Sequence, residues 1–557
     1  MRAGQRRRPS AWPAALRALA LMVALAVAGY GMLQPGRAGA NRGAGARAAA
    51  PTGPIAYRYG IVERTLAFGS LPQGEDRWDV PVTVTLTAPS GTVTQIGGFY
   101  YGDGTWVFRF SPPEPGLWRW SATLSYGTVK RTLAGSFATQ SQATPGFVRP
   151  SRFNRYLWSF EDGSPYYPLG LQACLRVSPH YGPPLTFILD GGLRSERARA
   201  AGRWQPGAGG RRVSLDAYVR TYASAGFNLF RWSVDNCGFS LYRSISPTGN
   251  VYSAAGGRYG DQLVRALHKY GMRVYMTFFG FNPPKNRGPA TMAAVLRYVR
   301  YVVARYGAYV DFWELMNEAR RSQFWYRTVT SYLRSIDPYH HPISTSRPPS
   351  DLSDFDIDSP HWYQRENELN SDLVTYKHFE RWKAAGKPVI VGEQGNAIAN
   401  WDPRSGVRMR LRMWTAFFSQ GSLIFWNETA FRDYEDRRFA NIWIGPTERR
   451  YASVLQRFVS GFDPRAVMAR ARVNHSELVR GYELGGPSGF ALYLTAYTTH
   501  SELTRRISVS IDPAFGGTAR WTDPATGRAL ATRRVPRGRQ RLKVPTFSTD
   551  IALKILP

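Results

Sequence analysis

Cysteine is almost absent from the chain, because only Cys174 and Cys237 occur among its 557 residues. This count excludes a small scaffold that is held together by many disulfides. Neither cysteine belongs to a CxxC motif or lies near a histidine cluster, and the chain has only 8 histidines. We therefore expect no metal site.

Acidic residues are also scarce, with 39 Asp and Glu against 72 Lys and Arg, so the formal net charge is +33. The basic residues are mostly arginines and are scattered through every segment. Runs of basic residues with interleaved aromatics, which are typical of nucleic-acid-binding proteins, are lacking. We expect no nucleic-acid partner. The charge reflects either an arginine-rich composition or a partner such as an acidic polysaccharide or an anionic cell envelope, since a positive surface attracts polyanions.

Repeats of a fixed period are absent, and one long apolar run stands out near the N-terminus. Basic residues precede "ALALMVALAVAGYGML", and the small-residue sequence "AGA" follows it. This order is typical of a secretory signal peptide. We interpret residues 1–40 as a signal peptide and 41–54 as a linker, and we expect a secreted protein. An uncleaved segment that anchors the protein to the outer face of the membrane is the alternative, since about 20 apolar residues span a bilayer.

Two parts of the chain alternate apolar and polar residues with a period of two. Residues 55–140 contain "WDVPVTVTLTAP" and "GLWRWSATLSY", separated by turn signals such as "PSG", "GDG" and "PEPG". Residues 467–557 contain "FALYLTAYTT" and "RRISVSID", which show the same alternation. Short alternating strands between turns predict an antiparallel β-sandwich in each part.

Between them, residues 141–466 alternate apolar strands with longer amphipathic segments. The predicted strands are "PYYPLGLQA", "FNLFRWSV", "MRVYMTFFG", "DFWELMNE", "HPISTS", "DIDSPHWY", "KPVIVGEQG" and "SLIFWNE". Eight strands with helices between most of them predict a (β/α)8 TIM barrel. The fold class is therefore a multidomain chain in which a TIM barrel is flanked by N-terminal and C-terminal β-sandwiches.

The active site of such a barrel lies at the carboxyl ends of the strands, so the last residues of each strand are the first candidates for functional residues. Strand four ends in Asn317 and Glu318, and strand seven ends in Glu393. The two carboxylates should face one pocket from opposite sides. Glycoside hydrolysis needs such a pair, one protonated to release the leaving sugar and one ionised to attack the anomeric carbon. Arg231, at the end of strand two, could keep Glu393 ionised by its opposite charge.

Five motifs in order along the barrel resemble glycoside hydrolase clan A, in particular its family 5-like members. "FWELMNEA" is similar to the acid/base strand of the clan, "VIVGEQGN" to its nucleophile strand, "GFNLFRW" to its arginine strand, "HWY" to its His-x-Tyr and "LIFWNE" to its strand-eight tryptophan. The resemblance implies the following roles: Glu318 as acid/base, Glu393 as nucleophile, and Arg231, Asn317, His361, Tyr363 and Trp426 as supporting or substrate-binding residues. Ala319 stands where the clan frequently has proline. The segment "GGFYYGDGTWVFRFSPPEPGLWRW" resembles the N-terminal sandwich of poorly characterised secreted glycosidases.

Other residues are weaker candidates. Glu428, in a second Asn-Glu pair on strand eight, is expected to be a structural or sugar-binding acid, and the tryptophans considered as sugar platforms are Trp325, Trp362 and Trp401. Cys174 and Cys237 follow strands one and two, so their loops should be neighbours at the catalytic face. Either a disulfide that braces this rim or two free buried thiols is compatible with that placement.

These observations predict a secreted, retaining glycoside hydrolase that uses two glutamates, needs no cofactor and acts on a polysaccharide or oligosaccharide. A transglycosylase would use the same residues and differ only in its acceptor. The alternative from another class is a non-catalytic carbohydrate-binding or cell-envelope protein on a degenerate barrel. The intact glutamate pair favours the enzyme, because a pure binder has no need of an acid and a nucleophile at one point.

Overall fold

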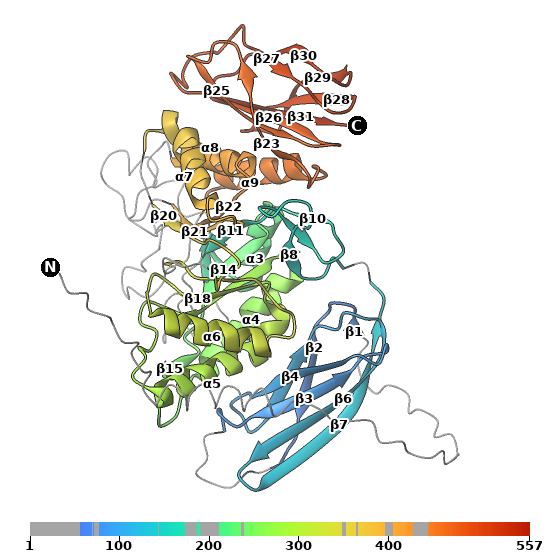
Figure 1. Ribbon diagram of the computed structural model, residues 1–557, viewed down its shortest axis with the longest axis vertical. Helices are drawn as coiled ribbons and strands as arrows, with labels where there is room; N and C mark the ends of the chain where they lie inside the picture. Colours follow the sequence, from blue (N-terminus) through green and yellow to red (C-terminus); the bar gives the residue numbers. More distant parts are fainter. Residues whose placement is uncertain are drawn as a thin grey trace, which may run out of the picture.

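The three parts of the molecule follow one another along its long axis in a computed structural model of the chain (Figure 1). The structure describes residues 56–69, 71, 77–142, 144–172, 186–189, 211–235, 239–347, 353–363, 366–395, 405–426 and 444–557. The predicted signal peptide and linker lie outside these ranges. No helix within them is long and apolar enough to cross a membrane.

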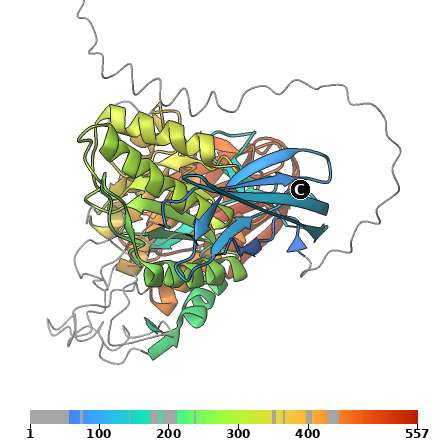
Figure 2. The same ribbon diagram turned by 90° about the horizontal axis from the view of Figure 1, so that it is seen from below.

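The N-terminal part is a β domain with one hydrogen-bonded sheet in the order β1-β7-β6-β3-β4-β5-β2. Its strands are β1 Ala56–Tyr57, β2 Val62–Leu66, β3 Val82–Thr87, β4 Val93–Tyr100, β5 Trp106–Phe110, β6 Gly116–Tyr126 and β7 Val129–Gln140. Phe110 on β5 and Trp118 on β6 pack edge to face with ring centroids 5.1 Å apart. Because β3 and β4 separate these two strands in the sheet, the sheet must fold over on itself and enclose a core. Figure 2 shows this domain in blue against the helices of the central part.

The central part is an eight-stranded parallel sheet that curls into a barrel. In chain order its strands are β11 Leu169–Gln172, β14 Leu229–Ser233, β17 Arg273–Phe279, β18 Phe312–Met316, β19 Ile343–Ser344, β20 His361–Trp362, β21 Ile390–Gln394 and β22 Ser422–Phe425. Each strand pairs with the next along the chain except at one seam, and β22 pairs with β11 to close the ring. At the seam between β19 and β20, the backbone N–H of Asp356 donates to the carbonyl of Ile343 at 2.8 Å. The predicted TIM-barrel arrangement and strand order are thus confirmed.

Helices cover the outside of the barrel (Figure 1). They are α3 Leu215–Ser224, α4 Ala254–Lys269, α5 Pro289–Tyr306, α6 Gln323–Ile336, α7 Ser371–Lys383, α8 Ser405–Phe418 and α9 Pro446–Val459. Local sequence explains where several begin: the side chains of Ser214, Ser253 and Ser322 accept backbone N–H groups at the N-termini of α3, α4 and α6. The described residues between β19 and β20 contain no helix, as expected. Helix α9 was not among the predicted helices.

The amino-terminal end of the barrel is closed by a small antiparallel sheet that the sequence did not predict. Its strands are β8 Val148–Pro150, β9 Trp158–Phe160 and β10 Pro165–Tyr166. Trp158 packs edge to face on Phe312 of β18, with ring centroids 5.0 Å apart. This apolar cluster fills the amino-terminal end of the barrel. The polar side chains of the interior lie at the opposite, carboxyl end. Smaller hairpins on the loops are formed by β12 Thr186–Leu189 with β13 Arg211–Ser214 and by β15 Tyr242–Ser244 with β16 Val251–Tyr252.

The C-terminal part is an antiparallel β domain of two sheets, in the orders β23-β25-β26-β31-β28-β29 and β24-β27-β30. Its strands are β23 Val467–Arg470, β24 Arg472–Val473, β25 Val479–Gly485, β26 Phe490–Ala496, β27 Ser508–Ile511, β28 Gly517–Thr522, β29 Ala529–Val535, β30 Gln540–Lys543 and β31 Asp550–Leu556. Val509 and Leu542 from the small sheet share one core with Leu553 of the large sheet. The large sheet is buried on its other face too, because Ala491, Tyr493 and Ala552 belong to the core of the central part.

Buried ion pairs join both β domains to the barrel. On the N-terminal side, Arg109 of β5 and Arg305 of α5 both pair with Asp261 of α4, each at 2.8 Å. On the C-terminal side, Asp550 of β31 pairs with Arg410 of α8 at 2.8 Å. Burial of such groups is tolerated because each carboxylate receives several charge-assisted hydrogen bonds. These pairs hold the domains against the outer helices and away from the carboxyl ends of the strands.

Candidate active site

The barrel brings the predicted polar side chains to its carboxyl end. Arg231 lies on β14 and Glu393 lies on β21, while Asn317 and Glu318 follow β18 directly. His361 opens β20, where it is in register with Glu393 of the neighbouring strand. Residues up to 162 positions apart in the chain therefore meet in one place. The parallel strand order is the cause, because every strand ends at the same rim.

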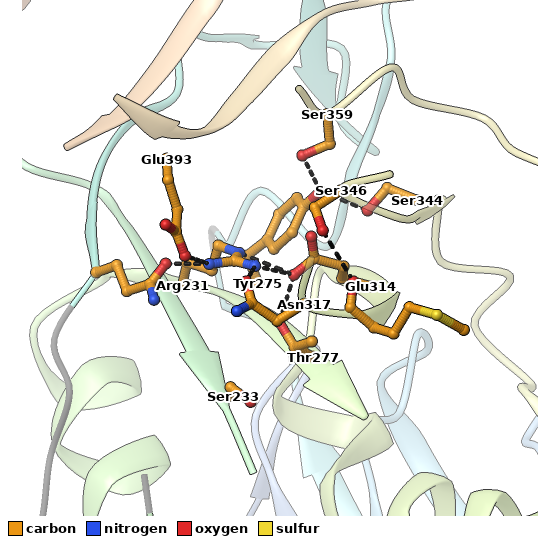
Figure 3. Close-up of polar contacts among 12 residues, drawn as sticks. Arg231, Ser233, Tyr275, Thr277, Glu314, Asn317, Ser344, Ser346, Ser359 and Glu393 are labelled. Atoms are coloured by element: carbon orange, nitrogen blue, oxygen red, sulfur yellow. Dashed lines mark hydrogen bonds and ion pairs between the residues drawn. The ribbon is translucent and has the colours of Figure 1, made fainter. Parts of the chain in front are cut away.

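Arg231 is the centre of the site and is fully buried (Figure 3). Its Nη1 atom lies 2.6 Å from Oε1 of Glu393, and its Nη2 atom donates to Oδ1 of Asn317 at 2.7 Å. Nη1 also donates to Gln172 at the end of β11. A guanidinium group can serve these partners together because its donors form a rigid planar fork. Arg231 thus fixes the side chains of Glu393 and Asn317 relative to each other.

Glu314 anchors the other side of Arg231. Its Oε2 atom accepts from Nε of Arg231 at 2.8 Å and from the hydroxyl of Thr277. Oε1 of Glu314 is buried and has no hydrogen-bond partner among the described residues. Beside it, the hydroxyl of Tyr275 donates to Ser359 at 2.8 Å and bonds to Ser344, which ties β17 to the seam of the barrel (Figure 3). Two carboxylates therefore share one buried guanidinium group.

His361 lies between the two predicted catalytic carboxylates. Its Nδ1 atom is 2.9 Å from Oε1 of Glu318 and 3.5 Å from Oε2 of Glu393. One oxygen of Glu318, one oxygen of Glu393 and a ring nitrogen of His361 all lie within 4.8 Å of one another. The Glu318 side chain is 24% exposed, whereas that of Glu393 is 5% exposed. Glu318 therefore faces the solvent side of the pair and Glu393 the interior side.

The backbone at Glu318 is strained. Its φ angle is +49°, in the left-handed region that residues other than glycine rarely adopt. The backbone N–H of Glu318 donates to the hydroxyl of Ser346 at 2.6 Å, and that hydroxyl donates to the carbonyl of Met316 at 3.1 Å. Such strain persists where surrounding contacts hold it, and it is concentrated at functional positions. Here it turns the Glu318 side chain toward His361.

His361, Arg347 and Arg231 all lower the pKa of Glu318. The hydrogen bond from His361 is the main reason that the pKa of Glu318 is held below its usual range, and the charge of Arg347 contributes to the same effect. Nη2 of Arg347 lies 3.8 Å from Oε2 of Glu318. These contacts favour the carboxylate form of Glu318.

Glu318, His361 and Glu393 could also be considered as ligands of a metal ion, since each offers one atom to a common point. The guanidinium group of Arg231 argues against this, because it already lies 2.6 Å from Glu393 and would repel a cation at that point. Nδ1 of His361 is likewise committed to a hydrogen bond with Glu318. The donor set fits a carboxylate pair better than a metal centre.

Four of the predicted aromatic residues lie within the described part of the chain. The hydroxyl of Tyr363 forms no hydrogen bond with Glu393 among the described residues, and its ring instead lies edge-on to that of His361, 6.2 Å away. Trp426 follows β22 and is partly buried against the barrel core. Its backbone N–H donates to the carbonyl of Gln394. Trp325 and Trp362 are only 0% and 4% exposed, so the suggestion that they are sugar platforms is wrong. Their rings were needed to fill space between helices and strands.

Cys174, Cys237, Trp401 and Glu428 lie outside the described residues, so the disulfide, the sugar platform and the second acid remain predictions.

Sequence reasoning missed a second set of polar residues, namely Gln172, Thr277, Glu314, Ser346 and Arg347. A signal for Glu314 was present, because it is a lone carboxylate inside the apolar strand "FWELM". Gln172 and Arg347 end or follow strands one and five. They would have been found by reading the end of every strand instead of only those that match a motif.

Comparison with known proteins gives matches in fold and in one domain. The sequence profile of a family described as a domain of unknown function, DUF5060, matches residues 57–125 in the N-terminal β domain. A crystal structure from Bacteroides vulgatus, provisionally named a glycoside hydrolase, is 14% identical with a TM-score of 0.61. The match covers 90% of this chain and 100% of that one. The whole three-part architecture is therefore shared with a solved protein.

Two further solved structures resemble smaller parts or resemble the chain less closely. A GH30 endoxylanase from Clostridium papyrosolvens is 12% identical with a TM-score of 0.40, over 62% of this chain and 93% of that one. A β-glucuronidase from Parabacteroides merdae is 9% identical with a TM-score of 0.37, over 90% of this chain and 74% of that one. No curated protein matches the chain in sequence.

Proposed function

We propose that the protein is a retaining glycoside hydrolase that cleaves a polysaccharide or oligosaccharide with Glu318 and Glu393. The observation that carries the proposal is the meeting of these two carboxylates at the barrel mouth, with oxygens within 4.8 Å. Retaining glycosidases have carboxyl groups about 5 Å apart, whereas inverting enzymes need roughly 6.5–9.5 Å to admit a water molecule. The pair is therefore suited to direct attack by one carboxylate.

Glu393 is assigned as the nucleophile because it is the more buried carboxylate and is held by Arg231 at 2.6 Å. Its oxygen attacks the anomeric carbon and forms a glycosyl ester, while protonated Glu318 gives its proton to the departing oxygen. Glu318 then removes a proton from water, which attacks the ester and releases Glu393. The sugar leaves with the anomeric configuration of the substrate.

The surrounding residues support these roles. Because Oδ1 of Asn317 accepts from Arg231, its Nδ2 group is left as a donor for a sugar hydroxyl beside the reacting carbon. Hydrogen bonds to the 2-hydroxyl strengthen in the transition state of such reactions. His361 contacts both carboxylates and is placed to hold Glu318 in position while its proton moves. The order of motifs supports clan A as the family, and the basic-then-apolar N-terminus supports export.

The test is chemical rescue of two variants. Glu318→Ala and Glu393→Ala are assayed on a panel of activated aryl glycosides with and without azide, and the anomeric configuration of the products is read by NMR. Each variant should lose activity by roughly a hundredfold to ten-thousandfold, since this is the range for general acid–base groups, and more for the nucleophile. Azide should restore turnover in both.

The products distinguish the roles. Azide should give a glycosyl azide of retained configuration with Glu318→Ala, because Glu393 still forms the ester, and of inverted configuration with Glu393→Ala. Exchange of these two outcomes would reverse the assignments. Full activity in Glu393→Ala would refute the mechanism. Tight glycan binding without any turnover by the unaltered protein would favour the non-catalytic alternative.

A further inference from the structure

Arg347 is an unusual feature of the barrel mouth. It follows β19 in the first described residues beyond the strand, and its side chain is 51% exposed. Its guanidinium group forms no hydrogen bond with any described residue, and its contact with Glu318 at 3.8 Å is too long to be one. The five N–H donors of this planar fork thus have no described acceptor within hydrogen-bond distance, and they lie beside the predicted acid. The buried arginine of this site, Arg231, differs in that its donors are engaged by Gln172, Glu314, Asn317 and Glu393.

The neighbouring loops at this rim are also cationic. The loop after β17 carries the exposed residues Lys285 and Arg287, and the loop after Glu318 carries exposed Arg320. Arg321 connects these two loops, because its guanidinium group donates to the carbonyls of Pro283 and Pro284. No described acidic residue forms an ion pair with Lys285, Arg287 or Arg320. The positive charge on this side of the site is thus not balanced by the described part of the protein.

We propose that Arg347 is the core of a subsite that binds an anionic group of the substrate, either a uronate carboxylate or a sulfate ester, next to the glycosidic bond that is cleaved. Oxyanions of these kinds present two oxygens that match the fork of an arginine and accept two parallel hydrogen bonds from it. The surrounding cations raise the local concentration of a polyanion at the mouth. This inference rests on the proposed function, since it places the subsite relative to Glu318.

The state of Glu318 gives independent support. To act as an acid, Glu318 must be protonated. The hydrogen bond from His361 is nevertheless the main reason that its pKa lies below the usual range, and the charge of Arg347 acts in the same direction. The other charged groups that face this region are Arg231 and Glu393. An anion bound to Arg347 would neutralise that guanidinium group and add a negative charge near Glu318, and both effects favour the protonated form. A neutral sugar would do neither.

The test compares Arg347→Gln with Arg537→Gln. Arg537 is an exposed arginine of the C-terminal domain, so its replacement changes the net charge equally at a distance from the barrel. Both variants and the unaltered chain are run by affinity gel electrophoresis in polygalacturonate, alginate, glucuronoxylan and chondroitin sulfate. Carboxyl-reduced forms of the three uronate polymers are the neutral references. Chondroitin sulfate is compared with its carboxyl-reduced form, its desulfated form and the form that has undergone both treatments, and only the last of these is neutral. About 0.15 M salt screens charges more than roughly 8 Å from the ligand.

We expect at least one native polymer to bind more tightly than its neutral form. Arg347→Gln should weaken that binding by roughly tenfold or more, as for loss of a charge-assisted hydrogen-bonded pair, while Arg537→Gln changes it less than about twofold. Loss on carboxyl reduction assigns a uronate, and loss on desulfation assigns a sulfate. No preference for any native polymer, or equal weakening by both variants, would overturn the subsite.

Hydrolysis of the same polymers separates this inference from the proposed function. Reducing ends are measured with the unaltered chain and with Glu393→Gln. Binding that depends on Arg347 without any Glu393-dependent release would refute the hydrolase and leave an anion-binding site. Release that depends on Glu393, comes from neutral forms equally well and is unchanged in Arg347→Gln would support the hydrolase and overturn the subsite.

Discussion

Arg231 and Glu393 form a buried ion pair in which Nη1 and Oε1 are 2.6 Å apart. The same guanidinium group also pairs with Glu314 at 2.6 Å, so a single cation on β14 holds carboxylates from β18 and β21. Removing one partner of such a buried arrangement leaves uncompensated charge. The geometry of the proposed nucleophile therefore depends on a residue that need not touch substrate.

We expect Arg231→Lys to lower kcat/KM by a hundredfold or more, because an ammonium group cannot serve Glu314, Glu393 and Asn317 together. Arg305→Lys is the matched control, since Arg305 is equally buried but pairs with Asp261 far from the site. It should reduce stability without changing the kcat of folded protein. Steady-state kinetics with thermal melts of both variants would check this. Similar kcat values for the two variants would contradict it.

Glu314→Gln should lower activity through the position of Arg231. Oε2 of Glu314 accepts from Nε of Arg231, and the neutral amide would hold that guanidinium group less firmly. We expect kcat to fall by about tenfold while KM changes little, because the positioned group acts mainly in the transition state. Asp337→Asn provides a comparison, since Asp337 is also a buried carboxylate but bonds to Trp313 and His341. A fall in kcat of the same size in Asp337→Asn would show a general structural effect instead.

Asp261→Asn should destabilise the contact between the N-terminal domain and the barrel. Burial alone would raise the pKa of Asp261, but Arg305 and Arg109 more than offset this and hold it below its usual range. Without the negative charge, two fully buried guanidinium groups would face each other. We expect a loss of about 3–5 kcal/mol in the free energy of unfolding, measured with chemical denaturant. Asp216→Asn, at an exposed pair with Lys269, should change stability little.

The buried carboxyl group of Asp358 should make the stability of the protein depend on pH. Burial raises its pKa to about 6 from the usual 3.8, although Lys387 and Arg381 act against this. The native state therefore keeps a proton that the unfolded chain releases, and stability is lost as the pH rises from about 4 through 6. Above this range the penalty amounts to roughly 3 kcal/mol.

The variant Asp358→Asn removes this titration. The difference in the free energy of unfolding between this variant and the unaltered chain should be close to zero near pH 4. Above about pH 6 the variant should be the more stable of the two. Because the other titrating groups are common to both proteins, the difference isolates Asp358. A difference that does not change between about pH 4 and pH 8 would show that this carboxyl group titrates normally.

The order of the barrel strands was readable from the sequence, because the strands are short apolar runs and most are separated by segments with a helical period, of which α3, α4 and α6 begin at a serine cap. The three-part architecture followed from the change between period-two and helical patterns. The small sheet β8–β10 was missed because its strands are two or three residues long, too short to show a period. Helix α9 was missed although a (β/α)8 barrel has a helix after its eighth strand and although Pro446 marks the N-terminus of this one.

The sequence by itself determined the residues at the strand ends, and with them Arg231, Asn317, Glu318, His361 and Glu393. It could do so because strand direction and side-chain period are local properties of the chain. Only the tertiary structure decided which partners these residues take. The strands that supply Glu314, Arg231 and Glu393 face the same barrel interior only when the sheet closes. The ion pairs of Arg231 with both carboxylates therefore depend on the tertiary structure and not on any local sequence pattern. The same closure placed Arg347 beside Glu318 and left its charge facing solvent.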